Sequence, residues 1–405
     1  MKILNFKKNI NPKLILEKNS FKLDDFIDPP SKFTPGEWFL VKGLDHKKRE
    51  IHFLGSANPY YSKGLDLKIS GQIELNDFNS LERQDDLSWK YIQNKLKMAH
   101  AEKNIYKFFE NGGRMIHGNL DGLHGLVVDL YQNCALIQIN SAGMEVYREK
   151  IKKEVEKITA KSAFFIDNTE ARKNECLPQN NSPIAIDELR VLENGFCYLV
   201  PILKMQKTGY YYDHRVNRSK MESVIRRLNK NINCGLDLFC YVGSWTMHAL
   251  RSGVPSMTCV DQSEVGETIA KNIKNNNLSG DTIFFKDDVF KFLEKCVDNK
   301  KYFDLIICDP PGFSKKEAQK KEALAGYRKL YNKIFKILMP QSILVVASCS
   351  QQISMVELDE MINEIALTLE KKISIMEVGL QSPDHTFSRL SGKSTYIKCL
   401  IYKVL

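Results

Sequence analysis

A cysteine and an aspartate each follow an apolar run in the C-terminal half of the sequence. Cys349 follows the run 342–348 and lies between two serines, and Asp309 follows the run 302–308. A thiolate that adds to carbon 6 of a cytosine makes carbon 5 nucleophilic towards a methyl sulfonium, so that one difficult step becomes two easier ones. A carboxyl group near ring nitrogen 3 stabilises the charge that develops there. We therefore predict that Cys349 is a nucleophile with Asp309 beside it, and the alternative is simple packing of a small thiol.

The residues after Asp309 support a ligand-binding loop. Pro310 and Pro311 force the chain out of regular structure directly after the carboxylate, which holds the acid and Phe313 beside a ligand. Adenine-N6 methyltransferases often carry an aromatic residue immediately after two such prolines. Gly312 occupies that position here, so adenine is disfavoured as the target.

Acidic residues also follow three earlier apolar runs. Asp237 can pair with an ammonium group, Asp261 can accept both hydroxyls of a ribose, and Asp287 or Asp288 can accept from an adenine amino group. A ligand with these groups and no phosphate is S-adenosylmethionine. The single Gly243 is not a G-x-G-x-x-G fingerprint, which disfavours NAD and FAD. For each acid the alternative is a cap on the following helix.

The C-terminal half alternates between strand-type and helix-type segments, which predicts βαβ units and a mainly parallel sheet. Ligands bind such sheets beyond the carboxyl ends of the strands. The last two strand-type runs have no helix between them, so we expect an antiparallel hairpin at the edge. We expect helices up to about residue 252 and over 263–276, 289–297, 321–338 and 354–370.

Two smaller domains are expected before this region. Residues 1–75 carry short β-type runs separated by Gly, Asp, Asn and Pro, which favours a small barrel. Residues 76–199 have the order strand, strand, helix, strand, strand, with strands over 125–131 and 134–140. The predicted domains are thus 1–75, 76–199 and an α/β domain over 200–405.

Composition limits the partners and the compartment. The 405 residues carry a formal net charge of +10, which fits a polyanionic partner such as RNA. No run of about 18 apolar residues and no signal peptide is present, so we expect a cytoplasmic protein without a membrane partner. The 10 cysteines form no C-x-x-C pair, which disfavours a metal site and a disulfide framework.

Six motifs together resemble the bacterial 23S ribosomal RNA cytosine-5 methyltransferases with an N-terminal PUA domain. They are KMQKTGYYYDHRVNR, LDLFCYVGSW, CVDQS, DDVFKFL, IICDPPGF and ASCS. The resemblance implies a PUA domain, a central α+β domain and a Rossmann-like class I methyltransferase domain with a seven-stranded sheet. It also implies S-adenosylmethionine as the cofactor and 5-methylcytosine in ribosomal RNA as the product.

The family's functional positions carry over onto matching residues of this chain. Asp309 matches the family's acid and Cys349 its nucleophile. Met205 departs from the glycine that usually precedes the Gln-Lys-Thr-Gly run, and the usual acidic residue before the final strand is missing. The residues expected on the cofactor are Lys207, Tyr210, Asp213, Arg215, Asp237, Phe239, Tyr241, Gly243, Asp261, Gln262, Asp287, Asp288, Asp309 and Pro310.

Two other functions are compatible with the sequence. One is a ribosomal RNA guanine methyltransferase on the same fold, which needs no thiol. The other is a non-catalytic RNA-binding or ribosome-assembly factor, which the net charge and the basic run 314–329 favour. The target nucleotide, the base that removes the carbon-5 proton and the oligomeric state are left open, with a homodimer among the options.

Overall fold

The computed structural model describes residues 2–8, 20–45, 47–60, 66–73, 87–179, 184–204, 209–228, 232–313, 317–387 and 395–405. Contacts divide the chain into two compact units. The first consists of residues 1–189, 205–210 and 384–392, and the second of residues 190–204, 211–383 and 393–405.

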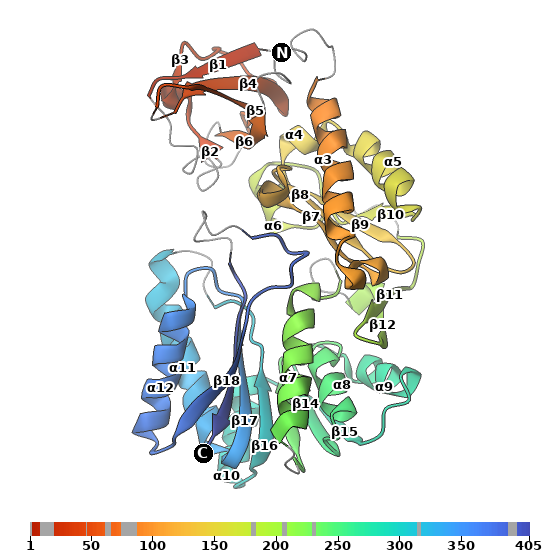
Figure 1. The fold of residues 1–405 in the computed structure, drawn as a ribbon, viewed down its shortest axis with the longest axis vertical. Helices are drawn as coiled ribbons and strands as arrows, with labels where there is room; N and C mark the ends of the chain where they lie inside the picture. The colour runs from red at the N-terminus through yellow and green to blue at the C-terminus, as the bar shows by residue number, and fades with distance from the viewer. Residues whose placement is uncertain are drawn as a thin grey trace. The chain divides into compact units, whose positions relative to one another are not determined.

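A six-stranded sheet opens the first unit, in the order β2-β6-β5-β4-β1-β3 (Figure 1). All its pairs are antiparallel except β1 with β4. Apolar side chains such as Phe26, Phe39 and Phe53 alternate along the strands and bury one small core. The strands are β1 (Lys2–Phe6), β2 (Ser20–Phe21), β3 (Phe26–Ile27), β4 (Glu37–Leu44), β5 (Glu50–Asn58) and β6 (Asp66–Ile73).

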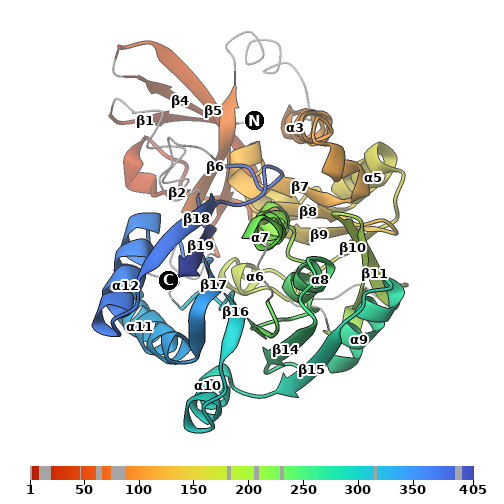
Figure 2. The same cartoon turned by 60° about the horizontal axis from the view of Figure 1, so that its bottom comes forward.

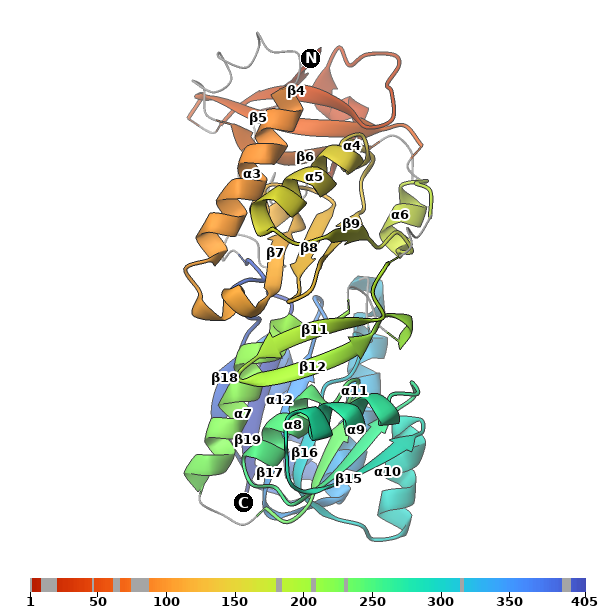
Figure 3. The same cartoon turned by 90° about the vertical axis from the view of Figure 1, so that its right-hand side faces the viewer.

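A second, four-stranded sheet of this unit has the order β10-β9-β8-β7 and packs against two helices (Figure 3). The antiparallel hairpin of β8 and β9 matches the two strands expected over 125–140. The strand β7 was not expected, because its five residues include Gly113, Arg114 and His117 and show no alternating apolar pattern. The elements are α3 (Leu87–Lys103), β7 (Gly113–His117), β8 (Leu126–Leu130), β9 (Ala135–Ile139), α4 (Ala142–Glu145), α5 (Arg148–Thr159), β10 (Ala163–Phe165) and α6 (Glu170–Asn174).

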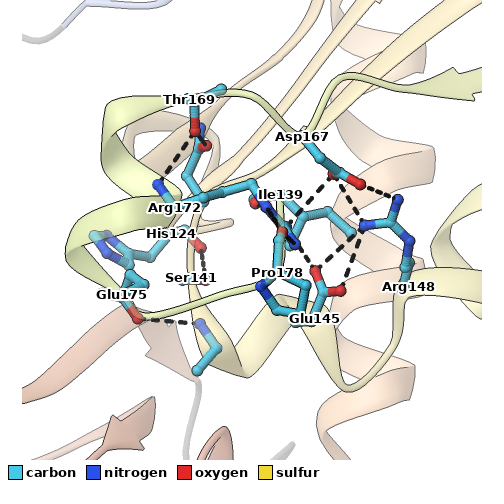
Figure 4. Close-up of polar contacts among 12 residues, drawn as sticks. His124, Ile139, Ser141, Glu145, Arg148, Asp167, Thr169, Arg172, Glu175 and Pro178 are labelled. Atoms are coloured by element: carbon cyan, nitrogen blue, oxygen red, sulfur yellow. Dashed lines mark hydrogen bonds and ion pairs between the residues drawn. The ribbon is translucent and has the colours of Figure 1, made fainter. Parts of the chain in front are cut away.

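Two arginines, the buried Arg172 and the partly buried Arg148, connect the short helix α6 and the end of strand β10 to the rest of this unit (Figure 4). The Arg172 guanidinium donates to the carbonyl groups of Ile139 and Pro178, both at 2.6 Å, and to Glu145 at 2.8 Å. Arg148 donates to Asp167 at 2.6 Å. Because each cation meets a carboxylate, the charges inside this unit are compensated.

The second unit is built on a seven-stranded sheet with the order β15-β14-β13-β16-β17-β19-β18 (Figure 2). The first five of these strands are parallel, and β19 pairs antiparallel with both β17 and β18. The order reverses at β13, which is the point where ligands bind in such sheets. The strands are β13 (Gly235–Leu238), β14 (Ser256–Asp261), β15 (Asp281–Lys286), β16 (Phe303–Cys308), β17 (Leu338–Ser348), β18 (Ile373–Gly379) and β19 (Lys398–Val404).

Helices cover both faces of this sheet (Figure 2). One face packs against α10, α11 and α12 around Leu293, Tyr331 and Ile362, and the other packs against α7 and α8 around Met221 and Trp245. The helices are α7 (Arg215–Leu228), α8 (Ser244–Arg251), α9 (Gly266–Asn275), α10 (Val289–Asp298), α11 (Lys320–Lys336) and α12 (Met355–Thr368). None of the helices within the described ranges is long and apolar enough to cross a bilayer.

A separate hairpin of β11 (Glu188–Glu193) and β12 (Phe196–Pro201) carries a buried acid of the second unit. Glu193 accepts two hydrogen bonds from Arg218, at 2.7 and 2.8 Å, and both side chains are buried. Burial alone raises the pKa of Glu193, but the Arg218 guanidinium, contacts with His248 and the charge of Arg215 outweigh it and lower the pKa to about 2. The pair therefore favours the folded chain at neutral pH.

We expect Glu193→Gln to reduce the free energy of unfolding by about 3–5 kcal/mol at pH 7, because it leaves the buried Arg218 charge without its carboxylate. The contribution of Glu193 is complete above pH 4.5 and disappears as the pH falls towards 2, since the folded pKa lies below the unfolded one. Urea unfolding monitored by circular dichroism at several pH values measures both effects. Glu264→Gln is the matched control, because its ion pair with Lys286 is exposed, and it should cost less than about 1 kcal/mol.

Candidate active site

Asp237 lies in β13 at the reversal of the strand order and is completely buried. Its Oδ2 accepts hydrogen bonds from the amide and the hydroxyl group of Thr246, at 3.1 and 2.7 Å. Its Oδ1 is buried and meets no hydrogen-bond donor among the residues that the structure describes. Burial, together with the nearby charges of Asp309 and Asp261, raises the pKa of Asp237 to about 7. Such an acceptor suits a cationic ligand group.

The loop between β13 and α8 has an uncommon backbone conformation. Phe239 and Tyr241 adopt positive φ angles of 61° and 47°, and Gly243 has a φ of 78°. Left-handed backbone costs free energy at residues other than glycine, and such residues cluster at ligand sites. The amide of Tyr241 donates to Asp261 Oδ2 at 3.0 Å, which ties this loop to the end of β14.

The acid that ends β14 and the two acids that follow β15 already have partners. Asp261 Oδ1 accepts from the amide of Ser263 at 2.8 Å. Gln262 donates to Asp288 at 2.7 Å, and Asp288 also caps α10 by accepting from the amide of Lys291. Asp287 pairs with Lys295 at 2.6 Å, and this hydrogen bond lowers the pKa of Asp287. The capping alternative thus applies to Asp288, while a role of these four residues at the cofactor stays a prediction.

Asp309 directly follows β16 and lies against the rings of Trp245 and His214. Trp245 Nε1 donates to its Oδ2 at 3.0 Å, and His214 Nε2 lies 3.5 Å from its Oδ1. The Asn217 amide group donates to the Leu380 carbonyl at 3.0 Å and to His214 Nδ1 at 3.1 Å. The Asn217 amide group thus holds the His214 ring in place, and the contact of Nε2 with Asp309 is an N···O approach without hydrogen-bond geometry.

Cys349 follows β17 and lies beside the Asp309 loop. Its Sγ is 4.0 Å from the carbonyl oxygen of Pro310, and a Cβ atom added at Gly312 would lie 3.4 Å from it. The thiol is partly exposed, unlike those of Cys240 and Cys308, which are buried. Burial raises the pKa of Cys308, so that thiol is not ionised at neutral pH. Cys349 therefore differs from the other thiols at these strand ends in being accessible.

Sequence reasoning missed three aromatic residues of this site. His214 and Trp245 contact Asp309, and their rings pack at 5.5 Å. Tyr211 packs against Tyr241 at 5.4 Å, and its pKa is raised by burial and by the charges of neighbours that include Asp309 and Cys349. Each lies inside a motif quoted above, but nothing in its spacing indicates which acid it meets.

The motif over 206–215 contributes to both units. Tyr210 belongs to the first, where its amide donates to Tyr131 Oη at 3.0 Å, and Lys207 lies outside the described residues. In the second unit, Asp213 accepts from Tyr396 at 2.8 Å and Arg215 is buried against the Tyr212 ring. Packing accounts for these contacts, and the cofactor role of these residues stays a prediction.

Comparisons with known proteins agree with this architecture. The family model described as Conserved hypothetical protein 95 matches residues 217–379. Ribosomal RNA large subunit methyltransferase I of Pseudoalteromonas atlantica is 30% identical over 341 residues, which cover 78% of this chain and 84% of the relative. The protein of that name from Shewanella frigidimarina is 28% identical over 337 residues, covering 80% and 83%.

The chain belongs to the ribosomal RNA large subunit methyltransferase I family. This membership confirms that it is a methyltransferase. A candidate SAM-dependent methyltransferase from Streptococcus mutans has the same fold, with a TM-score of 0.73 over 100% of both chains at 16% identity. The crystal structure of SMU.776 in its complex with SAH matches equally well, with a TM-score of 0.73 over 100% of both chains at 16% identity. The predicted cofactor, S-adenosylmethionine, is thereby confirmed.

Residues at the reversal of the strand order fit this cofactor. The buried Oδ1 of Asp237 is an acceptor without a donor among the described residues, and the ammonium group of S-adenosylmethionine can supply one. Asp261 retains lone pairs for ribose hydroxyls, since each of its oxygens accepts one amide. Within the described ranges no group of three or more His, Cys, Asp or Glu residues could hold a metal ion.

We expect the affinity for S-adenosylhomocysteine to fall about tenfold per pH unit below 7, because only ionised Asp237 pairs with an ammonium group and its pKa is about 7. Isothermal titration calorimetry between pH 5.5 and 8.5 measures this. Asp237→Asn should bind more weakly and lose the pH dependence. Asp281→Asn removes an exposed carboxylate from β15 and is the control. A flat profile for the unmodified protein would contradict the role of Asp237.

Proposed function

We propose that this chain methylates carbon 5 of a cytosine in large-subunit ribosomal RNA, with Cys349 as the covalent nucleophile. The observation that carries the proposal is the partly exposed thiol of Cys349 next to the loop that begins with Asp309. The RNA class rests on the names of the relatives and is consistent with the net charge of +10.

Carbon 5 of cytosine is a poor nucleophile, and the thiol activates it. Addition of Sγ to carbon 6 of the cytosine pushes electrons towards carbon 5, which then attacks an electrophilic methyl group. When bound, S-adenosylmethionine supplies that methyl group as a sulfonium. Loss of the proton from carbon 5 then expels Sγ and restores the aromatic ring.

The carboxylate of Asp309 orients the cytosine in this proposal. Trp245 donates a hydrogen bond to Oδ2 of Asp309, and the His214 ring lies 3.5 Å from Oδ1, which restricts the orientation of the carboxylate. Each oxygen keeps a lone pair for the amino edge of the base. The carboxylate can accept from the amino group of cytosine, and a protonated carboxyl group can donate to ring nitrogen 3 on the same edge.

The six-stranded sheet is proposed to bind the RNA as a PUA-like domain over residues 1–75. It would act together with the domains proposed over 76–199 and 200–405. The support is the antiparallel β architecture of the described part of residues 1–75, together with the sequence resemblance. Loops and unpaired nucleotides are the expected targets, since their bases can leave the stack.

The first test uses ribosomal RNA transcripts and labelled cofactor, followed by nucleoside mass spectrometry. We expect 5-methylcytosine from the unmodified enzyme and at least a thousandfold lower rate from Cys349→Ala, because the covalent route is lost. Cys197→Ser is the matched control, as it removes another partly exposed thiol. A methylated guanine, or full activity of Cys349→Ala, would favour the guanine methyltransferase alternative.

A second test concerns the orientation of Asp309. Trp245→Phe keeps an aromatic ring but removes the 3.0 Å N–H hydrogen bond. We expect kcat to fall about 10- to 100-fold with little change in cofactor affinity, since a hydrogen bond to a charged group contributes about 1.5–3 kcal/mol. Trp89→Phe in the first unit is the control. Unchanged kcat in Trp245→Phe would show that this hydrogen bond has no part in the reaction.

A further inference from the structure

A buried lysine lies next to the strand end that carries Cys349. Lys398 is the first residue of β19 and pairs with Ser348 in the register of β17 and β19. Its side chain is only 4% exposed. Its Nζ donates to the carbonyl oxygens of Ser350 and Tyr396, the second at 3.2 Å. The amine is therefore held at the residue that follows Cys349.

The known partners of this amine do not account for a buried cation. Two carbonyl groups can be satisfied by a neutral donor, whereas removing an ammonium group from water is costly unless an anion compensates for it. The nearby carboxylate of Glu357 bonds instead to Lys320 at 2.6 Å and to the cap of α12. Burial lowers the pKa of Lys398 to about 8, and the negative charges of Cys349 and Glu357 oppose this. Of these two described groups, Cys349 is the one that is not already engaged by another lysine in the contacts above.

Three other ionisable groups that the structure describes near Cys349 are Tyr211, Tyr327 and Asp309. Tyr211 and Tyr327 interact with its charge, and burial raises the pKa of both phenols, so they are neutral at pH 7. Asp309 is a further acid beside this thiol, and His214 lies against Asp309, with its Nε2 3.5 Å from Oδ1. Among these groups, Lys398 is the one whose charge favours a thiolate.

We propose that Lys398 is a positioning residue that stabilises the thiolate of Cys349 through its buried ammonium group. A cation within a few ångströms lowers the pKa of a thiol and increases the fraction available for attack. The catalytic consequence rests on the proposed function of Cys349, whereas the effect on the thiol does not. The two groups form a coupled pair, so that each holds the other in its charged form near neutral pH.

The test measures the pH dependence of Cys349 alkylation by iodoacetamide, with the peptide that contains Cys349 quantified by mass spectrometry. Lys398→Gln keeps a donor for the two carbonyl groups but removes the charge, and Lys398→Arg keeps the charge. We expect the midpoint of alkylation to rise by one pH unit or more in Lys398→Gln, with about tenfold slower reaction at pH 7. Lys398→Arg should restore most of the rate.

If Lys398 had only a structural role, Cys349 in the Lys398→Gln variant would be alkylated with the same pH midpoint as in the unmodified protein. If both variants fail to fold, the unmodified protein still decides: a midpoint at the ordinary thiol value of about 8.5 overturns the proposal. Alkylation needs neither RNA nor cofactor. If the pH midpoint of Cys349 alkylation is lowered but the methylation assay gives no 5-methylcytosine, only the proposed function is rejected. If 5-methylcytosine forms but the alkylation midpoint is ordinary, only the role of Lys398 is rejected.

Discussion

The parallel pairing of β16 with β17 is the constraint on which the candidate site depends. Cys308 pairs with Val346, so Asp309 is level with Ala347, and Cys349 lies two residues beyond it. Parallel strands end at the same edge of a sheet, and the turn through Pro310 brings that loop to within 4.0 Å of Sγ. A slip of one residue in this register would turn the following side chains to the opposite face.

Buried acids in the second unit differ in pKa because their partners differ. Glu193 and Asp237 are both buried, yet Glu193 has the cation of Arg218 and a pKa lowered to about 2. Asp237 has hydrogen bonds from Thr246, and the charged neighbours that the structure describes as acting on it are the acids Asp309 and Asp261, so its pKa is raised to about 7. Glu193 thus has a cationic partner within the protein and stabilises the fold. Asp237 can instead form an ion pair with a cationic ligand.

Several elements follow from local sequence because their signals are local. Ser354 and Glu357 form a capping box at the start of α12, where a helix was expected from residue 354. The other four helices of the alternating region also lie where expected, since their apolar residues recur with helical spacing. The same local chemistry limits the site predictions: Asp288 binds the next helix as a cap, and a cap and a ligand contact have the same sequence signal.

The sequence by itself determined the alternation of strands and helices, the acids at the strand ends and the candidate nucleophile. Only the tertiary structure decided which groups surround them. Trp245 meets Asp309 across 64 positions, and the amine of Lys398 meets the carbonyl of Ser350 across 48. Periodicity and spacing report on neighbours within a few residues, whereas these contacts arise from strand order, including the insertion of β19 between β17 and β18. That order depends on how the whole sheet buries its faces, which no single segment specifies.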